Sequence, residues 1–142
     1  MPRDVIAEES QLVRDLLSME QRMSDPQRWC KGQMYLKRDG VATEVPERAY
    51  AACFSGHAAL SVGASVRRLD PSQTNRITDI FKAFCAANPV ECRLVVSGQN
   101  SATPIPFNDS ASTTHDMMMA AMRRAIEYAR RTASRYVTSP PT

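Results

Sequence analysis

The sequence lacks the segments that would place a protein in a membrane or export it from the cell. No uninterrupted apolar run in its 142 residues approaches the roughly 18 residues that suggest a transmembrane helix. Its first residues, Met1-Pro2-Arg3-Asp4, also lack the charged and apolar regions of a signal peptide. These absences predict a cytoplasmic protein without membrane association.

Cysteine is scarce, and its spacing lacks the signature of a metal site. The four cysteines, Cys30, Cys53, Cys85 and Cys92, form no C-x-x-C pair, which is the spacing that makes a structural zinc site convincing. In a reducing cytoplasm they would stay unbridged. We therefore expect no metal and no cofactor, and we interpret the cysteines as small buried hydrophobic residues.

Internal repeats, heptad arrays and linkers of low complexity are absent as well. The length and the 43% hydrophobic content suit one domain with a real core. We predict a single domain over residues 1–142, with disordered tails at 1–4 and 138–142.

Apolar residues do recur at helical spacing in three segments. The first predicted helix covers residues 5–24, and the second begins at Pro46 and contains Gly56, which would let another backbone approach closely. The third runs from Asp70-Pro71 to Asn88-Pro89, because a residue before proline is pushed out of the helical region. The apolar rows are Leu12, Leu16, Met19 and Met23; Ala49, Tyr50, Cys53 and Leu60; and Ile77, Ile80, Phe81 and Phe84.

A fourth helix closes the chain. Thr113 is its predicted N-cap, with Asp116 three residues later in a capping-box arrangement. Its methionine face is broad enough for self-association, which leaves a homodimer as an alternative to a monomer. The apolar row consists of Met118, Met122, Ala125, Ala129 and Ala133, widened by Met119 and Ile126.

Two short β elements complete the predicted fold. Residues 33–37 and 41–45 flank Asp39-Gly40, and Asp-Gly between β-prone runs is typical of a hairpin. Residues 92–96 form a further short strand, and the polar, proline-bearing residues 97–106 form a surface loop. The predicted class is α+β and mostly helical, with about four helices, a short β-hairpin and one further short strand.

Three motifs follow one another along the chain: Trp29-Cys30-Lys31-Gly32, then Cys53-Phe54-Ser55-Gly56-His57-Ala58, then Phe107-Asn108-Asp109 with Thr113 and Asp116 behind it. In order and spacing they resemble an uncharacterised family of small bacterial and phage proteins, a domain of unknown function. The resemblance covers residues 10–134 and implies a compact single domain. At His57 the chain departs from the family pattern, which more often has a small residue there, and this implies no family-wide catalytic or metal role for His57.

One candidate site is catalytic. Cys53 and His57 are spaced i and i+4 on the predicted second helix and would share a face. A thiol activated by His57 or His115, with Asn108 or Asp109 orienting the base, would serve a cysteine-dependent hydrolase or transferase. A cysteine within an apolar helix is more often an inert packing residue.

The other candidate site is a binding niche formed by Trp29, Asn108 and Asp109. Asn and Asp ahead of a helix often bond their own backbone, and a lone tryptophan often fills the core with its indole N–H on a carboxylate such as Asp109. The cluster therefore predicts either a loop held by its own side chains or a place for a small ligand.

Positive charge gathers in the last helix without a nucleic-acid-binding motif. The net charge is only +3, and an arginine-rich helix face is more often solvated than bound to phosphate, so nucleic acid is not the expected partner. We expect a small non-enzymatic binding or regulatory protein, of phage or accessory-genome origin, acting on an unknown protein or small ligand. The cysteine-dependent enzyme is the alternative. The arginines are Arg123, Arg124, Arg130, Arg131 and Arg135.

Overall fold

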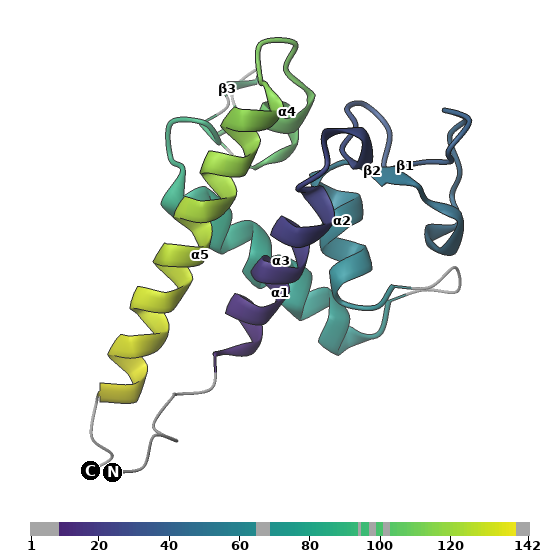
Figure 1. The fold of residues 1–142 in the computed structure, drawn as a ribbon. Helices are drawn as coiled ribbons and strands as arrows, with labels where there is room; N and C mark the ends of the chain where they lie inside the picture. The colour runs from purple at the N-terminus through teal and green to yellow at the C-terminus, as the bar shows by residue number, and fades with distance from the viewer. Residues whose placement is uncertain (1–8, 65–68, 94, 97–98, 101–102, 139–142) are drawn as a thin grey trace.

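Helices make up most of the described structure, which is a computed structural model. In that part of the chain, five α-helices and two 3₁₀ helices occur with two pairs of very short strands (Figure 1). The predicted class, α+β and mostly helical, is confirmed. The described residues are 9–64, 69–93, 95–96, 99–100 and 103–138.

Three long helices form the core. α1 (Gln11–Met23) contacts α3 (Pro71–Ala87) and α5 (His115–Thr138), which also contact each other (Figure 1). The shorter α2 (Phe54–Ser61) packs against α1 and α3. Removal of their apolar side chains from water is the main stabilising contribution. The buried cluster includes Val13, Leu16, Met19, Met23, Phe54, Ile80, Phe84, Met118, Met122 and Ala125.

α1 begins at its capping residue. Ser10 Oγ accepts a hydrogen bond from the Val13 N–H at 3.2 Å, which satisfies a free donor of the first turn. Three of the four residues in the predicted apolar row are fully buried, so the row is confirmed. The part of the predicted helix before residue 9 lies outside the described residues.

The N-cap of α5 is Thr114, and the prediction of Thr113 is wrong. The Met117 N–H donates to Thr114 Oγ1 at 3.1 Å, and the Met118 N–H donates to the Thr114 carbonyl at 3.0 Å. Thr113 is buried, and its carbonyl accepts from Lys31 Nζ at 2.7 Å. Two adjacent threonines have the same capping chemistry, so the sequence pattern alone could not choose between them.

The methionine row of α5 faces the interior of the same chain. Met118 and Met122 are fully buried, and Met119 is 6% exposed. These side chains therefore offer no apolar face to a second copy. The argument for a homodimer is removed, and the homodimer itself remains an untested prediction.

The predicted antiparallel hairpin is present, but its second strand differs from the predicted one. The chain turns at Gly40, whose φ of +85° suits glycine and whose N–H donates to the Lys37 carbonyl at 2.8 Å. β1 (Tyr35–Leu36) then pairs with β2 (Ala51–Ala52). The predicted partner, residues 41–45, contributes a single bridge at Ala42.

Burial explains this choice of partner. Val41 in the predicted second strand is 54% exposed, whereas Ala51 and Ala52 are buried. A short strand has little stability unless one face is covered, so β1 pairs with the segment that lies under α2.

The second helix begins later than predicted. Pro46 opens a 3₁₀ helix, η3 (Pro46–Arg48), and α2 begins only after β2, with Cys53 as its N-cap. Proline suits the first turn of either kind of helix, which is why the signal misled. Gly56 has its predicted role, because a Cβ there would collide with the backbone carbonyl oxygen of Met34.

α3 begins and ends where the sequence predicted. Asp70 and Gln73 form a capping box, with hydrogen bonds of 2.8 and 3.0 Å between each side chain and the other residue's N–H. At the other end, Asn88 Nδ2 donates to the Phe84 and Ala121 carbonyls, both at 3.0 Å. The last contact ties α3 to α5.

The segment between α3 and α5 holds more structure than predicted. β3 (Val95–Val96) lies within the predicted strand 92–96, and it pairs with β4 (Gln99–Asn100). α4 (Ile105–Asp109) then follows. The prediction of a loop over 97–106 is wrong at β4 and at the start of α4, and residues 97–98 and 101–102 lie outside the described residues. Pro104 and Pro106 fit the first turn of α4, where proline lacks only a donor that would be free anyway.

No helix in the described residues is both long enough and apolar enough to cross a membrane. Of the predicted tails, residues 1–4 and 139–142 lie outside the described ranges. Thr138 is the last residue of α5.

The arginines on the outer face of α5 lie close to carboxylates. Such pairing leaves their charge partly satisfied within the chain, in line with the interpretation of a solvated helix face. The ion pairs are Arg130 with Glu9 at 2.6 Å, Arg124 with Glu91 at 3.0 Å and Arg123 with Glu20 at 3.8 Å.

Candidate functional site

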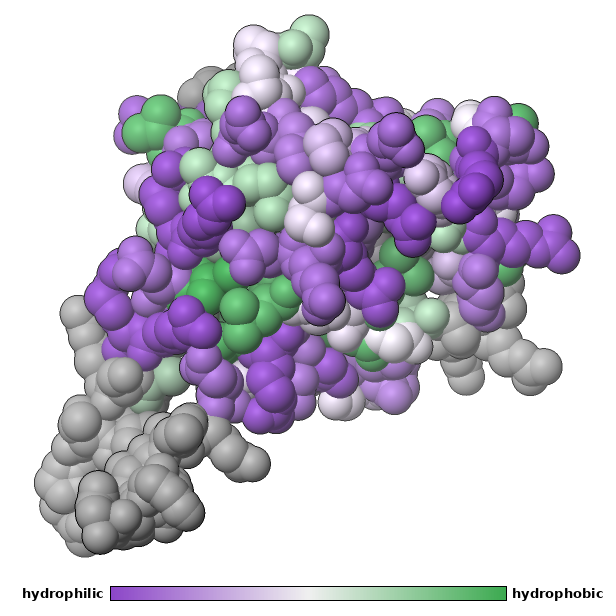
Figure 2. Space-filling model, in the orientation of Figure 1, coloured by the Kyte–Doolittle hydropathy of each residue, from purple (hydrophilic) through white to green (hydrophobic). Residues whose placement is uncertain are grey.

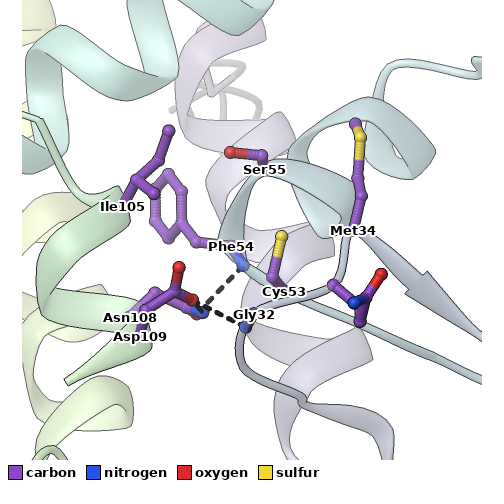
Figure 3. A pocket seen from close by; sticks show the side chains of 9 residues that line it. Gly32, Met34, Cys53, Phe54, Ser55, Ile105, Asn108 and Asp109 are labelled. Carbon is purple, nitrogen blue, oxygen red and sulfur yellow. Dashed lines mark hydrogen bonds between the residues drawn. The ribbon is translucent and has the colours of Figure 1, made fainter. Parts of the chain in front are cut away.

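A cavity of about 240 Å³ opens where α2 begins (Figure 3). It lies between the loop before β1, the first residues of α2 and the short helix α4. We call it the α2 cavity. Its lining residues are Gly32, Gln33, Met34, Cys53, Phe54, Ser55, Ile105, Asn108 and Asp109.

Asn108 joins the segments that surround the α2 cavity. Its Oδ1 accepts from the Trp29 indole N–H at 2.6 Å and from the Phe54 N–H at 3.0 Å. Its Nδ2 donates to the Cys30 carbonyl at 3.1 Å and to Asp109 Oδ1 at 2.9 Å. A carboxamide has four hydrogen-bonding positions, and this fully buried side chain uses all of them. Asn108 is therefore a structural link and has no free group for a ligand.

Asp109 is exposed at the cavity edge. Its Oδ1 accepts from the Gly32 N–H at 2.9 Å as well as from Asn108 (Figure 3). Gly32 has a φ of +78°, a conformation that other residues rarely adopt. The predicted bond between Asp109 and the Trp29 indole is wrong, because the indole reaches Asn108 instead.

Trp29 lies behind the α2 cavity and does not line it. Its half-buried ring is 5.9 Å from the His115 ring, and Lys31 Nζ is 5.4 Å from its ring centroid. Lys31 Nζ also donates to the Ser110 carbonyl at 2.6 Å. Trp29 thus supports Asn108, and of the three predicted binding residues only Asn108 and Asp109 reach the cavity.

Cys53 brings a thiol to the cavity from the N-cap of α2 (Figure 3). Burial raises the pKa of the thiol; the N–H groups of Gly56 and Ser55 oppose this rise, and the Asp109 carboxylate adds to it. The net direction is upward, so the thiol is neutral at pH 7. A neutral thiol is a weak nucleophile.

Neither histidine joins Cys53 at the cavity. His57 Nε2 is 2.7 Å from the Arg28 carbonyl oxygen, and His115 Nε2 is 2.7 Å from the Met23 carbonyl oxygen. Among the described residues, those that line the α2 cavity include no histidine. The predicted catalytic candidates are therefore separated, with the thiol in the cavity and both imidazoles outside it.

Metal ligands do not gather anywhere in the described ranges: no group of three or more His, Cys, Asp and Glu side chains there could hold a metal ion. Cys53 is the N-cap of α2, and His57 lies in its first turn. The two residues are joined by their backbones, because the His57 N–H donates to the Cys53 carbonyl at 2.9 Å.

Several lining residues were not predicted. Met34 and Ile105 are exposed apolar residues in irregular or short elements, where no periodic pattern marks them. Gly32 was visible as the end of the Trp29 motif, and its positive φ now explains why a glycine stands there. That motif was the one signal in the sequence that pointed to this side of the cavity.

Comparison with known proteins gives a family and nothing narrower. Residues 8–128 match the Family of unknown function (DUF6197). No curated protein and no solved structure matches the chain. The matched range includes every residue that lines the α2 cavity. The chain belongs to the family of unknown function DUF6197.

Proposed function

We propose that the protein is a non-enzymatic binding protein whose α2 cavity takes a small ligand with an apolar body and a positively charged head. The observation that carries the proposal is the cavity, which places exposed apolar side chains beside a fixed carboxylate. Its volume of about 240 Å³ lies slightly below the range of about 300–1,000 Å³ common for drug-sized ligands, so it suits a smaller molecule.

The apolar side of the cavity supports this proposal. Met34 is 45% exposed and Ile105 is 46% exposed, while Phe54 is fully buried behind them. Large apolar side chains that remain exposed around a cavity are typical of ligand-binding sites. A ligand that covers both side chains removes their surface from water, which favours binding by about 25 cal/mol for each Å² of apolar surface covered.

The polar side of the cavity defines the ligand head. Asn108 has no free hydrogen-bonding position, the Cys53 thiol is neutral, and Gln33 and Ser55 are uncharged, so Asp109 is the only charged side chain among the described lining residues. The Gly32 N–H and Asn108 hold its carboxylate in place without neutralising its charge. A fixed, exposed carboxylate favours an ammonium or a similar cation over an anion.

The proposal is tested with three ligands that share one ring: benzylamine, benzyl alcohol and benzoate. Titrations followed by amide chemical shifts should show benzylamine binding most tightly and benzoate most weakly, with shifts at Gly32, Ser55 and Ile105. Asp109→Asn keeps the acceptor oxygen and removes the charge, and it should weaken benzylamine binding about threefold to fivefold, to the level of benzyl alcohol.

Asp79→Asn is the matched control, because Asp79 is an exposed aspartate on α3 that does not line the cavity. It should leave all three affinities unchanged. Equal binding of the three ligands, or shifts confined to other parts of the protein, would disprove the proposal.

A cysteine-dependent enzyme is the second candidate, because Cys53 lines the cavity and two helix N–H groups favour its thiolate. Iodoacetamide at about pH 6 separates the two functions. We expect native protein to stay unlabelled at Cys53 and denatured protein to react. Selective labelling of native Cys53 at that pH would place the enzyme first.

A further inference from the structure

A second cavity, of about 260 Å³, lies between the end of α1, the 3₁₀ helix η2 (Pro26–Arg28), η3 and α2. It shares no lining residue with the α2 cavity. We call it the His57 cavity. Its lining residues are Arg22, Arg28, Pro46, Glu47, Ala49, Tyr50, Ala51, His57 and Leu60.

His57 is one of the residues that line this cavity, and its ring carries a buried acceptor. A carbonyl oxygen can only accept a hydrogen bond, so the 2.7 Å contact with the Arg28 carbonyl places the proton of the neutral imidazole on Nε2. Nδ1 is then a free lone pair. It is buried and has no hydrogen-bond partner among the described residues, although the side chain is only 3% exposed. Such an atom is rare in folded proteins and calls for a partner.

Two guanidinium groups line the same cavity. Arg22 and Arg28 form no ion pair with any described carboxylate, and both are exposed. Glu47 also lines the cavity and has an interaction of its own. Two cations against one carboxylate leave the lining positively charged.

Tyr50 orders one of these cations. The Arg28 guanidinium lies 4.4 Å from the Tyr50 ring centroid, and Arg38 lies 4.8 Å from the same centroid. The Tyr50 hydroxyl lies 3.1 Å from Gln27 Oε1 and donates to it. The stacked ring limits the freedom of Arg28, so less conformational entropy is lost when Arg28 binds a ligand.

We infer that the His57 cavity binds the singly protonated phosphate group of a small phosphate monoester. Arg22 and Arg28 would donate to the unprotonated oxygens, and the phosphate hydroxyl would donate to His57 Nδ1. The two arginines favour an anion, and the unprotonated Nδ1 accepts a hydrogen bond. The cavity therefore favours an anion that also carries a hydroxyl group. The site is independent of the function proposed for the α2 cavity.

The selection has a charge-matched test. Methyl phosphate at about pH 5.5 is mainly a monoanion with one hydroxyl, since its second pKa is about 6, whereas methyl sulfate is a monoanion without one. Chemical-shift titration should show methyl phosphate binding about tenfold more tightly, a difference of about 1.4 kcal/mol. The ¹⁵N resonance of His57 Nδ1 should move with methyl phosphate. Equal affinity, or an unchanged Nδ1 resonance at saturation, would overturn the inference.

Arginine variants locate the site. Arg22→Gln and Arg28→Gln should each weaken methyl phosphate binding about fivefold to tenfold, because each removes a charged donor. Arg38→Gln is the control, since Arg38 stacks on the same tyrosine but does not line the cavity, and it should change the affinity less than about twofold. Equal losses in all three variants would show a general charge effect and contradict the site.

An internal partner for Nδ1 is the competing explanation. Ser61 Oγ is the other buried side-chain atom without a partner in the described residues, and Ser61 follows His57 by one helical turn. Ser61→Ala should leave the Nδ1 resonance of the ligand-free protein unchanged and should keep methyl phosphate binding. A shift of that resonance in the variant would mean that Ser61 already occupies Nδ1, and the inference would fail.

Discussion

The long helices and the segments around the α2 cavity are stabilised by different interactions. Between α1, α3 and α5 the contacts are mainly apolar, with side chains such as Phe84 and Met122 fully buried, and one ion pair, Asp15 with Arg76 at 2.7 Å, joins α1 to α3. Around the cavity, Trp29, Cys30 and Phe54 are connected through the amide of Asn108. Apolar contacts are non-directional and scale with area, whereas hydrogen bonds depend on the position of single atoms.

This difference determines how each region should fail. The helical core loses stability in proportion to the volume removed, because its neighbours relax only partly around a gap. In the cavity region one side chain, Asn108, bonds to residues 29–30 and to α2, so a change of a few atoms weakens several connections together. A ligand site built in this way is fixed in shape even though its segments are short and irregular.

The largest effect is expected in the core. Phe84→Ala should lower the free energy of unfolding by about 4 kcal/mol, since the ring is fully buried and lies 4.6 Å from the Phe54 ring and 6.2 Å from the Phe107 ring. Urea unfolding measures the loss. Phe84→Leu, which keeps most of the volume, should lose about 1–2 kcal/mol. Equal losses in the two variants would argue against volume as the cause.

The next effect tests the connections that Asn108 makes in the cavity region. Asn108→Ala should cost about 3 kcal/mol, because it leaves the Trp29 and Phe54 donors without a partner. Trp29→Phe should cost about 1 kcal/mol, and the double variant should cost less than the sum. Trp29→Phe and Asp109→Ala should be additive, since the indole does not reach Asp109. Additivity of the Trp29 and Asn108 variants would contradict the link.

Acid should lower the stability of the protein through His57 of α2, whose Nε2 contacts the Arg28 carbonyl of η2. Burial lowers the pKa of His57 from 6.5 to about 4; the bond to Arg28 opposes this shift, and the charges of Arg22 and Arg28 add to it. Between these values the unfolded chain binds a proton that the folded chain does not. Stability is therefore retained above about pH 6.5 and falls by up to about 3 kcal/mol as the pH drops to about 4.

Unfolding of the wild type and of His57→Gln across this pH range isolates the contribution of His57. The difference in stability between the two proteins should change with pH along the titration of one group. A constant difference from pH 7 to about 4 would show that His57 titrates alike in both states.

The smallest effect concerns the first turn of α5. Thr114→Ala should cost about 1 kcal/mol, because it removes the acceptor of the Met117 N–H. Thr113→Val keeps the carbonyl that Lys31 contacts and removes no capping acceptor, so it should cost less than Thr114→Ala. Thermal melts compare the two, and the reverse order would restore Thr113 as the cap.

The sequence predicted the helical region well because its signals are local. An apolar row such as that of α1 needs only the helical period, and the Asp70 cap of α3 needs only its own first turn. Signals that suit two structures were less useful. Pro46 fits a 3₁₀ helix as well as an α-helix, and two neighbouring threonines fit the same cap.

The cavity region could be predicted only in part because its contacts are distant in sequence. The sequence motifs predicted that Trp29, Asn108 and Asp109 form one cluster, and two of these residues, Asn108 and Asp109, line the cavity. The partner of the indole was wrong, since neighbouring Asn and Asp side chains offer the same acceptor chemistry. Met34 and Ile105 were missed, because exposed apolar residues outside a regular element follow no period.

The position of Asn108 in the chain has a consequence for the order of folding. Its partners, the Trp29 indole, the Cys30 carbonyl and the Phe54 N–H, precede it by 79, 78 and 54 residues. During synthesis from the N-terminus, Trp29, Cys30 and Phe54 are therefore made well before the amide that connects them to α4. Contacts across such separations form late, after local helices. The nascent chain can bury part of its core early, but the α2 cavity comes into being only after Asn108 has been synthesised.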